Sequence, residues 1–280
     1  MNSKIVLAQI DSVLGNIEKN IDRHCEYIEK AIDRKAFLVV FPELSLTGYV
    51  LRDLNYELAI NPSKSQVLNP IKKLSKYINV ICGGVEEGNN YGIYNSAFYF
   101  SKGEYITSHK KVYLPTYGLF EEERYFSPGR ELNPIDTEFG KIGILICEDF
   151  WHLTLPYILA KKGVMLIVGL SASPTRISPG ENEFQQDKTN NEFHKVYAKL
   201  LSLYISWCNR VGYEEGMNFW GGSEIVSPIG SVIAKAPLFE KSLIEADLSL
   251  DFIKRSRIFS KHFVDDDIMF TFNELQKIIK

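Results

Sequence analysis

Residues 141–151 read KIGILICEDFW, and in this stretch the apolar pattern of a buried strand changes abruptly to charged residues. After Lys141 an unbroken run of apolar residues and glycine leads to Cys147, which is typical of a strand covered on both faces. Glu148 and Asp149 follow at once, and two adjacent charges require the chain to leave the core there. The sequence therefore places Cys147 at the end of a buried strand.

Strand-like and helix-like segments alternate on both sides of this stretch. Before it, the sequence predicts helices over 15–35 and 65–78 and strands over 4–10, 36–43, 79–87, 95–101 and 104–112, the last two forming a hairpin. After it, we expect a helix over 153–163, a strand over 164–173, a longer helix over 192–212, and strands over 221–228 and 230–237. Such alternation is typical of an α/β domain with mixed sheets covered by helices.

No linker rich in proline, glycine or serine divides the chain. We therefore expect one domain over residues 1–250, followed by a tail over 251–280. Apolar residues in this tail fit an oligomer contact, or equally a cover for the domain's own core; they are Phe252, Ile253, Phe259, Phe263, Ile268, Met269, Phe270 and Phe272.

Composition excludes several classes of partner. The chain has 280 residues, 45% of them hydrophobic, and its formal net charge is −3 without a dominant charged block. This gives no electrostatic footprint for nucleic acid or for an anionic membrane surface. The apolar run near the start is too short for a signal peptide or a membrane span, so we expect a cytoplasmic protein.

Metal and nucleotide motifs are missing from the sequence. The 4 cysteines and 5 histidines are scattered, with no pair at zinc-ligand spacing. Neither a G-x-x-x-x-G-K-[ST] loop nor a G-x-G-x-x-G turn is found. We therefore expect no metal and no organic cofactor.

Two other predicted strands also end at a charged side chain, as the strand before Cys147 ends at a thiol. The run AFLVVFPE (36–43) stops at Glu43, and the strand over 104–112 runs into Lys110 and Lys111. A carboxylate, an ammonium and a thiol thus stand where strands leave the core. In open α/β sheets that edge is where ligands bind.

These three groups form a coherent set for nucleophilic catalysis. A free thiol is mostly protonated at neutral pH, and a neighbouring base or cation raises its thiolate fraction. Glu43 would accept the proton, while Lys111 and the backbone N–H of Glu148 would stabilise the negative charge that develops on the attacked group. Each residue also has an ordinary interpretation: a cysteine packed in the core, a glutamate in a turn and a lysine in a solvated pair.

Three blocks in order resemble the nitrilase or carbon–nitrogen hydrolase superfamily: FPELSLTGY (41–49), KVYLPTYGLFEEERYFSPG (111–129) and GILICEDFW (143–151). AQIDSVLGNIEKN (8–20) and CNRVGYEEGMNFWGGSEIVSPIG (208–230) extend the resemblance over about residues 4–248. It implies a four-layer α-β-β-α sandwich. Within the superfamily the blocks are most similar to the glutaminase domain of glutamine-dependent NAD synthetases, which passes ammonia to a fused synthetase domain.

The resemblance also implies roles for residues at matching positions. It makes Glu43 the general base, Lys111 the transition-state stabiliser and Cys147 the nucleophile. A second glutamate of the family matches Glu122 best, although Glu121 and Glu123 flank it. Substrate-binding positions of the glutaminase-like branch match Tyr49, Tyr117 and Ser173.

Arg176 lies in a polar loop that does not align with the glutaminase pattern, and its guanidinium would suit a substrate carboxylate. Glutamine specificity is left open by this loop. The implied reaction is hydrolysis of a small amide through a cysteine thioester, either alone or with ammonia delivered to a separate synthetase. Hydrolysis of N-carbamoyl amines or nitriles, and a non-catalytic scaffold, are the alternatives. The family resemblance further implies a homodimer or higher homo-oligomer.

Overall fold

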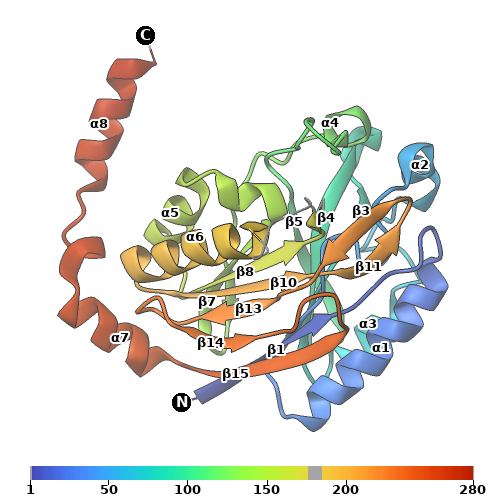
Figure 1. The fold of residues 1–280 in the computed structure, drawn as a ribbon, viewed down its shortest axis with the longest axis horizontal. Helices are drawn as coiled ribbons and strands as arrows, with labels where there is room; N and C mark the ends of the chain where they lie inside the picture. Colours follow the sequence, from blue (N-terminus) through green and yellow to red (C-terminus); the bar gives the residue numbers. More distant parts are fainter. Residues whose placement is uncertain (1, 176–184, 280) are drawn as a thin grey trace.

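Two β-sheets stacked face to face form the centre of the molecule in the computed structural model, which describes residues 2–175 and 185–279 (Figure 1). The first is 6-stranded with the order β15-β1-β2-β3-β4-β5. Its strands are β1 (Asn2–Gln9), β2 (Leu38–Val40), β3 (Asn79–Glu87), β4 (Ile93–Ser101), β5 (Glu104–Lys110) and β15 (Ser242–Ser249). As predicted, β4 and β5 form an antiparallel hairpin.

The second sheet is also 6-stranded, with the order β14-β13-β10-β8-β7-β6. Its strands are β6 (Ile135–Thr137), β7 (Gly140–Ile146), β8 (Leu166–Ser171), β10 (Tyr204–Asn209), β13 (Glu224–Val226) and β14 (Val232–Lys235). Three central strands, β7, β8 and β10, run parallel, so their carboxyl ends meet at one edge. A 3-stranded sheet joins β11 (Val211–Glu214), β12 (Met217–Trp220) and β9 (Pro174–Thr175).

Helices cover the outer face of each sheet. Helices α1 (Ile17–Asp33) and α3 (Asn69–Leu74) pack on the first sheet, and α5 (Thr154–Lys161) and α6 (Gln185–Leu201) pack on the second (Figure 1). Within β7, Ile144 and Ile146 enter the core between the sheets, whereas Leu145 faces the core under α5 and α6. Successive strand residues point to opposite faces, so a strand covered on both faces needs a continuous apolar run. The predicted four-layer α-β-β-α sandwich is confirmed.

The predicted helix over 192–212 is wrong in its second half. Helix α6 ends at Leu201, Ser202 has a left-handed φ of 49°, and Tyr204–Asn209 form the buried strand β10. In β10, Tyr204 and Cys208 enter the core between the sheets, while Ile205 and Trp207 face the helices. A buried apolar run does not distinguish helix from strand by periodicity alone.

The C-terminal segment begins with a strand that the sequence did not predict. Strand β15 pairs antiparallel with β1 along the edge of the first sheet. Helix α7 (Leu250–Phe259) follows, and its Ile253 is buried in the core between the sheets. The start of the tail therefore packs on its own domain. Whether the domain ends at residue 250 stays a prediction.

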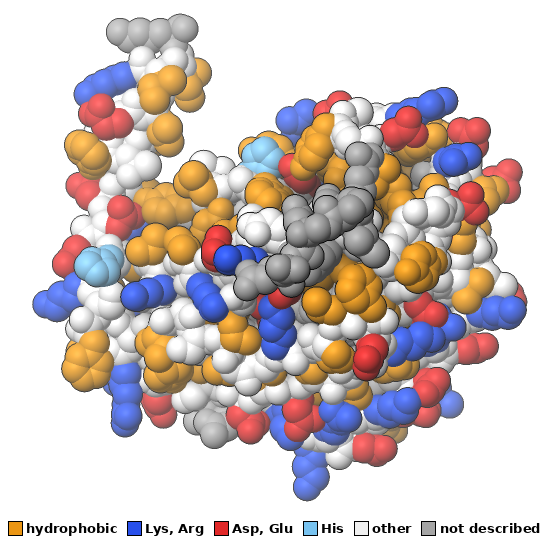
Figure 2. Space-filling model, in the orientation of Figure 1, with side chains coloured by type: hydrophobic (Ala, Val, Ile, Leu, Met, Phe, Trp, Pro, Cys, Tyr) orange, Lys and Arg blue, Asp and Glu red, His pale blue; other side chains and the backbone are white. Residues whose placement is uncertain are grey.

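Helix α8 (Ile268–Ile278) is an arm that projects away from the sheets (Figure 1). None of its residues is buried, and apolar side chains are spread along it (Figure 2). Within the described residues, no helix is long and apolar enough to cross a bilayer. The oligomer contact expected of this arm stays a prediction.

Candidate active site

Cys147 occupies a sharp turn between a strand and a helix. It follows β7 directly and begins the 3₁₀ helix η3 (Cys147–Trp151), with a left-handed φ of 44°. A residue other than glycine in this region is strained, and such strain persists where the surrounding structure imposes it. The turn is held on the neighbouring strand, where the Ser171 hydroxyl donates to Cys147 Sγ at 3.3 Å.

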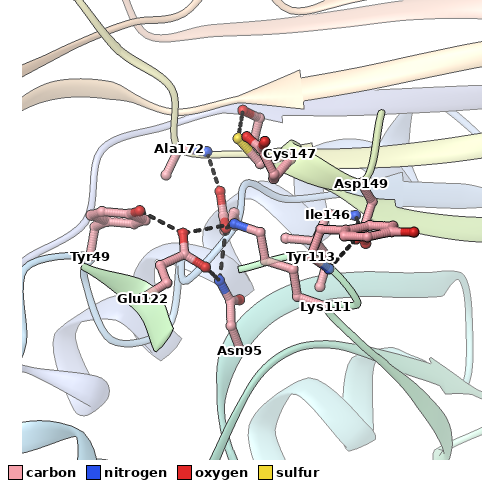
Figure 3. Close-up of polar contacts among 12 residues, drawn as sticks. Tyr49, Asn95, Lys111, Tyr113, Glu122, Ile146, Cys147, Asp149 and Ala172 are labelled. Atoms are coloured by element: carbon pink, nitrogen blue, oxygen red, sulfur yellow. Dashed lines mark hydrogen bonds and ion pairs between the residues drawn. The ribbon is translucent and has the colours of Figure 1, made fainter. Parts of the chain in front are cut away.

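Lys111 lies between two carboxylates in the interior of the protein. Its Nζ donates to Glu43 Oε1 and to Glu122 Oε1, each at 2.7 Å. All three side chains are buried, and those of Lys111 and Glu43 have no exposed surface. Figure 3 shows Glu122, Asn95 and Ala172 arranged around the Lys111 ammonium, with Cys147 close by. Of the three glutamates at 121–123, the structure brings Glu122 to the lysine.

Two residues that the sequence did not single out hold the Glu43 carboxylate. The backbone N–H of Ala172 donates to Oε2 at 2.8 Å, and Asn95 Nδ2 donates to Oε1 at 2.8 Å. Ala172 directly follows β8, and Asn95 belongs to β4, so both sheets contribute. A carboxylate held by fixed donors from opposite sheets keeps one orientation.

Asp149 ties the cysteine turn to the lysine segment. Its carboxylate accepts hydrogen bonds from the backbone N–H groups of Val112, Tyr113 and Ile146, each at 3.0 Å, and from His109 Nε2 at 3.0 Å. These amides flank Lys111 and Cys147. The sequence had marked Asp149 only as a charge that leaves the core, yet it is fully buried because four donors compensate its charge.

Burial and neighbouring charges shift the protonation of this cluster. Burial lowers the pKa of Lys111, but the Glu122 and Glu43 carboxylates outweigh burial and raise it well above its ordinary value, so the ammonium stays charged. Burial raises the pKa of Glu122 to about 7, against the Lys111 charge that lowers it. Burial and the Glu43 carboxylate raise the pKa of Cys147 above its usual range, although Lys111 lowers it. The Cys147 thiol is therefore neutral in the resting protein.

Tyr49 and Tyr117 lie at different depths. The Tyr49 hydroxyl donates to Glu122 Oε1 at 2.6 Å, inside the cluster. Burial and the Glu122 carboxylate raise the pKa of Tyr49 well above its usual range, so this hydroxyl keeps its proton. Tyr117 is 58% exposed, and its hydroxyl donates to Glu148 Oε2 at 2.9 Å, outside the buried cluster.

Two further substrate-binding residues were predicted, Ser173 and Arg176. Ser173 lies two residues beyond β8, and its backbone N–H donates to Asn209 Oδ1 at 2.9 Å. Arg176 lies outside the described residues. Among the residues described, no three histidine, cysteine, aspartate or glutamate side chains are grouped to hold a metal ion.

Sequence reasoning missed Asn95, Asp149 and Ala172 for different reasons. Asn95 is one of two adjacent polar residues, with Ser96, near the start of a buried strand, which is a weak signal, and Ala172 contributes only its backbone. Asp149 stands in the quoted stretch itself, and its place directly after a strand end was the signal that could have found it.

Fold and site together define the class: an α-β-β-α sandwich in which a cysteine at a strained turn lies by a buried lysine and two buried glutamates. Residues 4–258 match the carbon–nitrogen hydrolase family model, and the chain belongs to this family, within the nitrilase superfamily.

Individual relatives agree with this assignment. The glutamine-dependent NAD(+) synthetase of Thermotoga maritima is 33% identical over 252 residues, covering 89% of this chain and 42% of that protein. Omega-amidase NIT2-B of Xenopus laevis is 28% identical over 246 residues, covering 85% of this chain and 86% of that protein. The crystal structure of Saccharomyces cerevisiae Nit3, of the nitrilase superfamily, has a TM-score of 0.80 at 25% identity, covering 92% of this chain and 93% of that one. The chain spans less than half the length of the Thermotoga synthetase.

Proposed function

We propose that this protein hydrolyses a small amide to the acid and ammonia through a thioester at Cys147. The observation that carries the proposal is the position of Lys111 Nζ, 2.7 Å from both Glu43 and Glu122, within the electrostatic reach of the Cys147 thiol. A buried ammonium between two fixed carboxylates can stabilise developing negative charge without reorganising.

In the first half of the reaction, Glu43 takes the Cys147 proton as Sγ attacks the amide carbonyl carbon. The oxyanion is stabilised by Lys111 and the backbone N–H of Glu148. Protonated Glu43 then donates its proton to the amide nitrogen, the carbon–nitrogen bond breaks, and ammonia leaves. A thioester between the acyl group and Cys147 remains.

In the second half, water replaces ammonia. Glu43 takes a proton from the water as its oxygen attacks the thioester carbon, and Glu122 keeps Lys111 in place for the second oxyanion. Collapse of this intermediate breaks the carbon–sulfur bond, and the Cys147 thiolate regains its proton from Glu43. The acid product leaves, and the resting thiol is restored.

For the substrate we propose glutamine or another small amide that carries a carboxylate. The name of the Thermotoga relative, a glutamine-dependent NAD(+) synthetase, supports glutamine, and that of the Xenopus relative, an omega-amidase, supports hydrolysis of an amide. Tyr117 and Glu148 would contact the substrate near the surface, with Ser173 and Arg176 as further proposed contacts. If glutamine is the substrate, the ammonia would pass to a separate synthetase.

Ammonia release by wild type and Cys147→Ala tests this proposal. The panel contains glutamine, asparagine, short aliphatic amides, N-carbamoyl amines and nitriles. We expect release from an amide by the wild type, and a loss of at least about 10³-fold in kcat for Cys147→Ala. Acid formed faster from nitriles or N-carbamoyl amines would instead favour those alternatives. A folded wild type that is silent across the panel would favour a scaffold.

A further inference from the structure

Arg210 and Glu214 form a buried ion pair that contacts the backbone of Tyr49. Arg210, directly after β10, has no exposed surface, and its Nη1 donates to Glu214 Oε2 at 2.9 Å. Its Nε and Nη2 have no hydrogen-bond partner among the described residues. Unpaired guanidinium donors in the interior are costly, and apolar residues of similar volume often serve stability equally well. Stability alone therefore gives a poor account of Arg210.

Glu214, in β11, connects this ion pair to the backbone of Tyr49. Its Oε1 accepts from the N–H groups of Tyr49 at 2.7 Å and Val50 at 2.6 Å. Gly48 makes the close approach possible, because a β-carbon there would lie 2.9 Å from Glu214 Oε2 and its φ is +86°. The carboxylate thus fixes the backbone from which the tyrosine side chain begins.

Phe219, in β12, connects the same guanidinium to the ring of Tyr49. The guanidinium carbon of Arg210 lies 4.2 Å from the Phe219 ring centroid. Phe219 in turn meets the Tyr49 ring edge-on, with the centroids 5.9 Å apart. Arg210 is therefore connected to Tyr49 in two ways: through Glu214 to the Tyr49 backbone, and through Phe219 to the Tyr49 ring.

The hydroxyl of Tyr49 transmits this support to the site. It donates at 2.6 Å to Glu122 Oε1, the same oxygen that accepts from Lys111. We propose that Arg210 and Glu214 are positioning residues for amide hydrolysis, fixing Tyr49 and, through it, the carboxylate that holds Lys111. This inference rests on the proposed function and adds residues that contact neither the substrate nor Cys147.

A double-mutant cycle between Glu214→Gln and Tyr49→Phe tests the proposal. Glu214→Gln keeps the side-chain shape and removes the charge, and Tyr49→Phe removes only the hydroxyl. We expect each single variant to lower kcat by about 10- to 100-fold with a smaller change in KM, since misplacement of about 1 Å is known to cost this much. If Glu214 acts through Tyr49, the double variant loses little more than the worse single variant. If the loss of kcat in the double variant equals the product of the two single losses, the proposal is wrong.

A matched control separates positioning from stability. Glu224, in β13, is another buried carboxylate, 2% exposed, and it accepts from His194 Nδ1 in helix α6 at 2.7 Å. Glu224→Gln should lower the thermal unfolding temperature as much as Glu214→Gln does, but leave kcat within about twofold of wild type. If both variants lose activity in proportion to stability, the ion pair is merely structural and the proposal is wrong.

Phe219→Leu examines the second route without leaving a charge unpaired. It removes the ring between Arg210 and Tyr49, and we expect it to lower kcat by about tenfold, with no further loss in a Tyr49→Phe background. A full multiplicative loss in that background would contradict transmission through the ring.

A readout without substrate keeps this inference separate from the reaction itself. The rate at which iodoacetamide alkylates Cys147, followed by peptide mass spectrometry, depends on the charges of Lys111, Glu43 and Glu122 around the thiol. Glu214→Gln and Tyr49→Phe should change this rate in the same direction and non-additively. If no amide is hydrolysed but the alkylation cycle is non-additive, the proposed function fails and the positioning network stands. Additive alkylation changes would overturn the network.

Discussion

Gly83 in β3 lies so close to Leu44 that a β-carbon at residue 83 would stand 2.3 Å from the Leu44 backbone nitrogen. Leu44 itself has a left-handed φ of 49° and directly follows Glu43. The backbone of β3 therefore supports the turn that carries the general base we propose. Because the contact is with backbone, no side-chain rotation can relieve an added methyl group.

Gly83→Ala should displace the Glu43 turn and lower kcat by about 10²-fold, because Glu43 would no longer align with Lys111 and the Ala172 N–H. Gly143→Ala is the matched control, since the three atoms nearest to its β-carbon would all belong to the flexible side chain of Leu159, the nearest at 2.8 Å. Steady-state kinetics on the best amide of the panel measures both variants. Equal losses of kcat would contradict a specific role for Gly83.

Asp149→Asn should weaken the connection between the Lys111 and Cys147 segments. The amide nitrogen that takes the place of Oδ2 cannot accept, so the hydrogen bond from the Ile146 N–H is lost, whereas His109 Nε2 can pair with the amide as an acceptor in its other tautomer. Each bond to a charged acceptor contributes about 1.5–3 kcal/mol, so we expect a loss of about 2 kcal/mol in the free energy of unfolding, together with lower kcat. Urea unfolding and kinetics measure the two effects. An unchanged kcat would show that the hydrogen bonds of Asp149 are dispensable for catalysis.

The pKa of Glu122, about 7, predicts an acid limb in the pH profile. Lys111, Glu43 and Tyr49 face this carboxylate, and protonation below about pH 7 removes one of the two charges that hold Lys111. We expect kcat/KM, which reports the free enzyme, to rise with pH through about 7. In Glu122→Gln this inflection should vanish as activity falls. A profile with its inflection unchanged in the variant would assign the titration elsewhere.

Because His24 is buried, we expect the protein to lose stability in mild acid. It is fully buried, Nδ1 donates to the Asn20 carbonyl at 2.6 Å, and Nε2 lies 2.9 Å from Ser45 Oγ. Burial lowers its pKa from 6.5 to about 4. The unfolded chain therefore binds a proton at higher pH than the folded protein, and stability present above pH 6.5 is lost as pH falls towards 4.

Between pH 7 and pH 5 this linkage lowers the free energy of unfolding by about 2 kcal/mol. Urea titrations of wild type and His24→Gln at both values measure it. The variant should be less stable at pH 7 but should lose about 2 kcal/mol less between the two values. Identical pH dependence of the two proteins would exclude His24 as the cause.

From the exposed apolar residues of helix α8, we expect the protein to self-associate. An isolated helix of 11 residues is marginal in water, yet α8 exposes an apolar stripe formed by Ile268, Phe272 and Leu275. We expect a second copy of the chain to cover it. Sedimentation analysis should show a dimer or larger species for wild type and a smaller species for Phe272→Glu with Leu275→Glu. A wild type that is monomeric at micromolar concentration would contradict this.

Much of the site could be predicted because its residues stand at strand ends. Glu43 and Cys147 each directly follow an apolar run, and Lys111 directly follows a predicted strand, so all three could be placed at strand ends from the sequence. Asn95, Ala172 and Arg210 could not be found this way. A backbone N–H carries no sequence signal, and a polar residue within a buried run shows its role only when its partner from another element is known.

By itself, the sequence determined the alternation of strands and helices, the α/β class and the strand ends that carry Glu43, Lys111 and Cys147, because these follow from local apolar periodicity and from the cost of burying charge. Only the tertiary structure decided that Tyr204–Asn209 form a strand, that Glu122 is the glutamate at Lys111, and that Asp149 joins two segments. These outcomes depend on how strands distant in the chain pair and stack, and local pattern does not encode which side chains then meet.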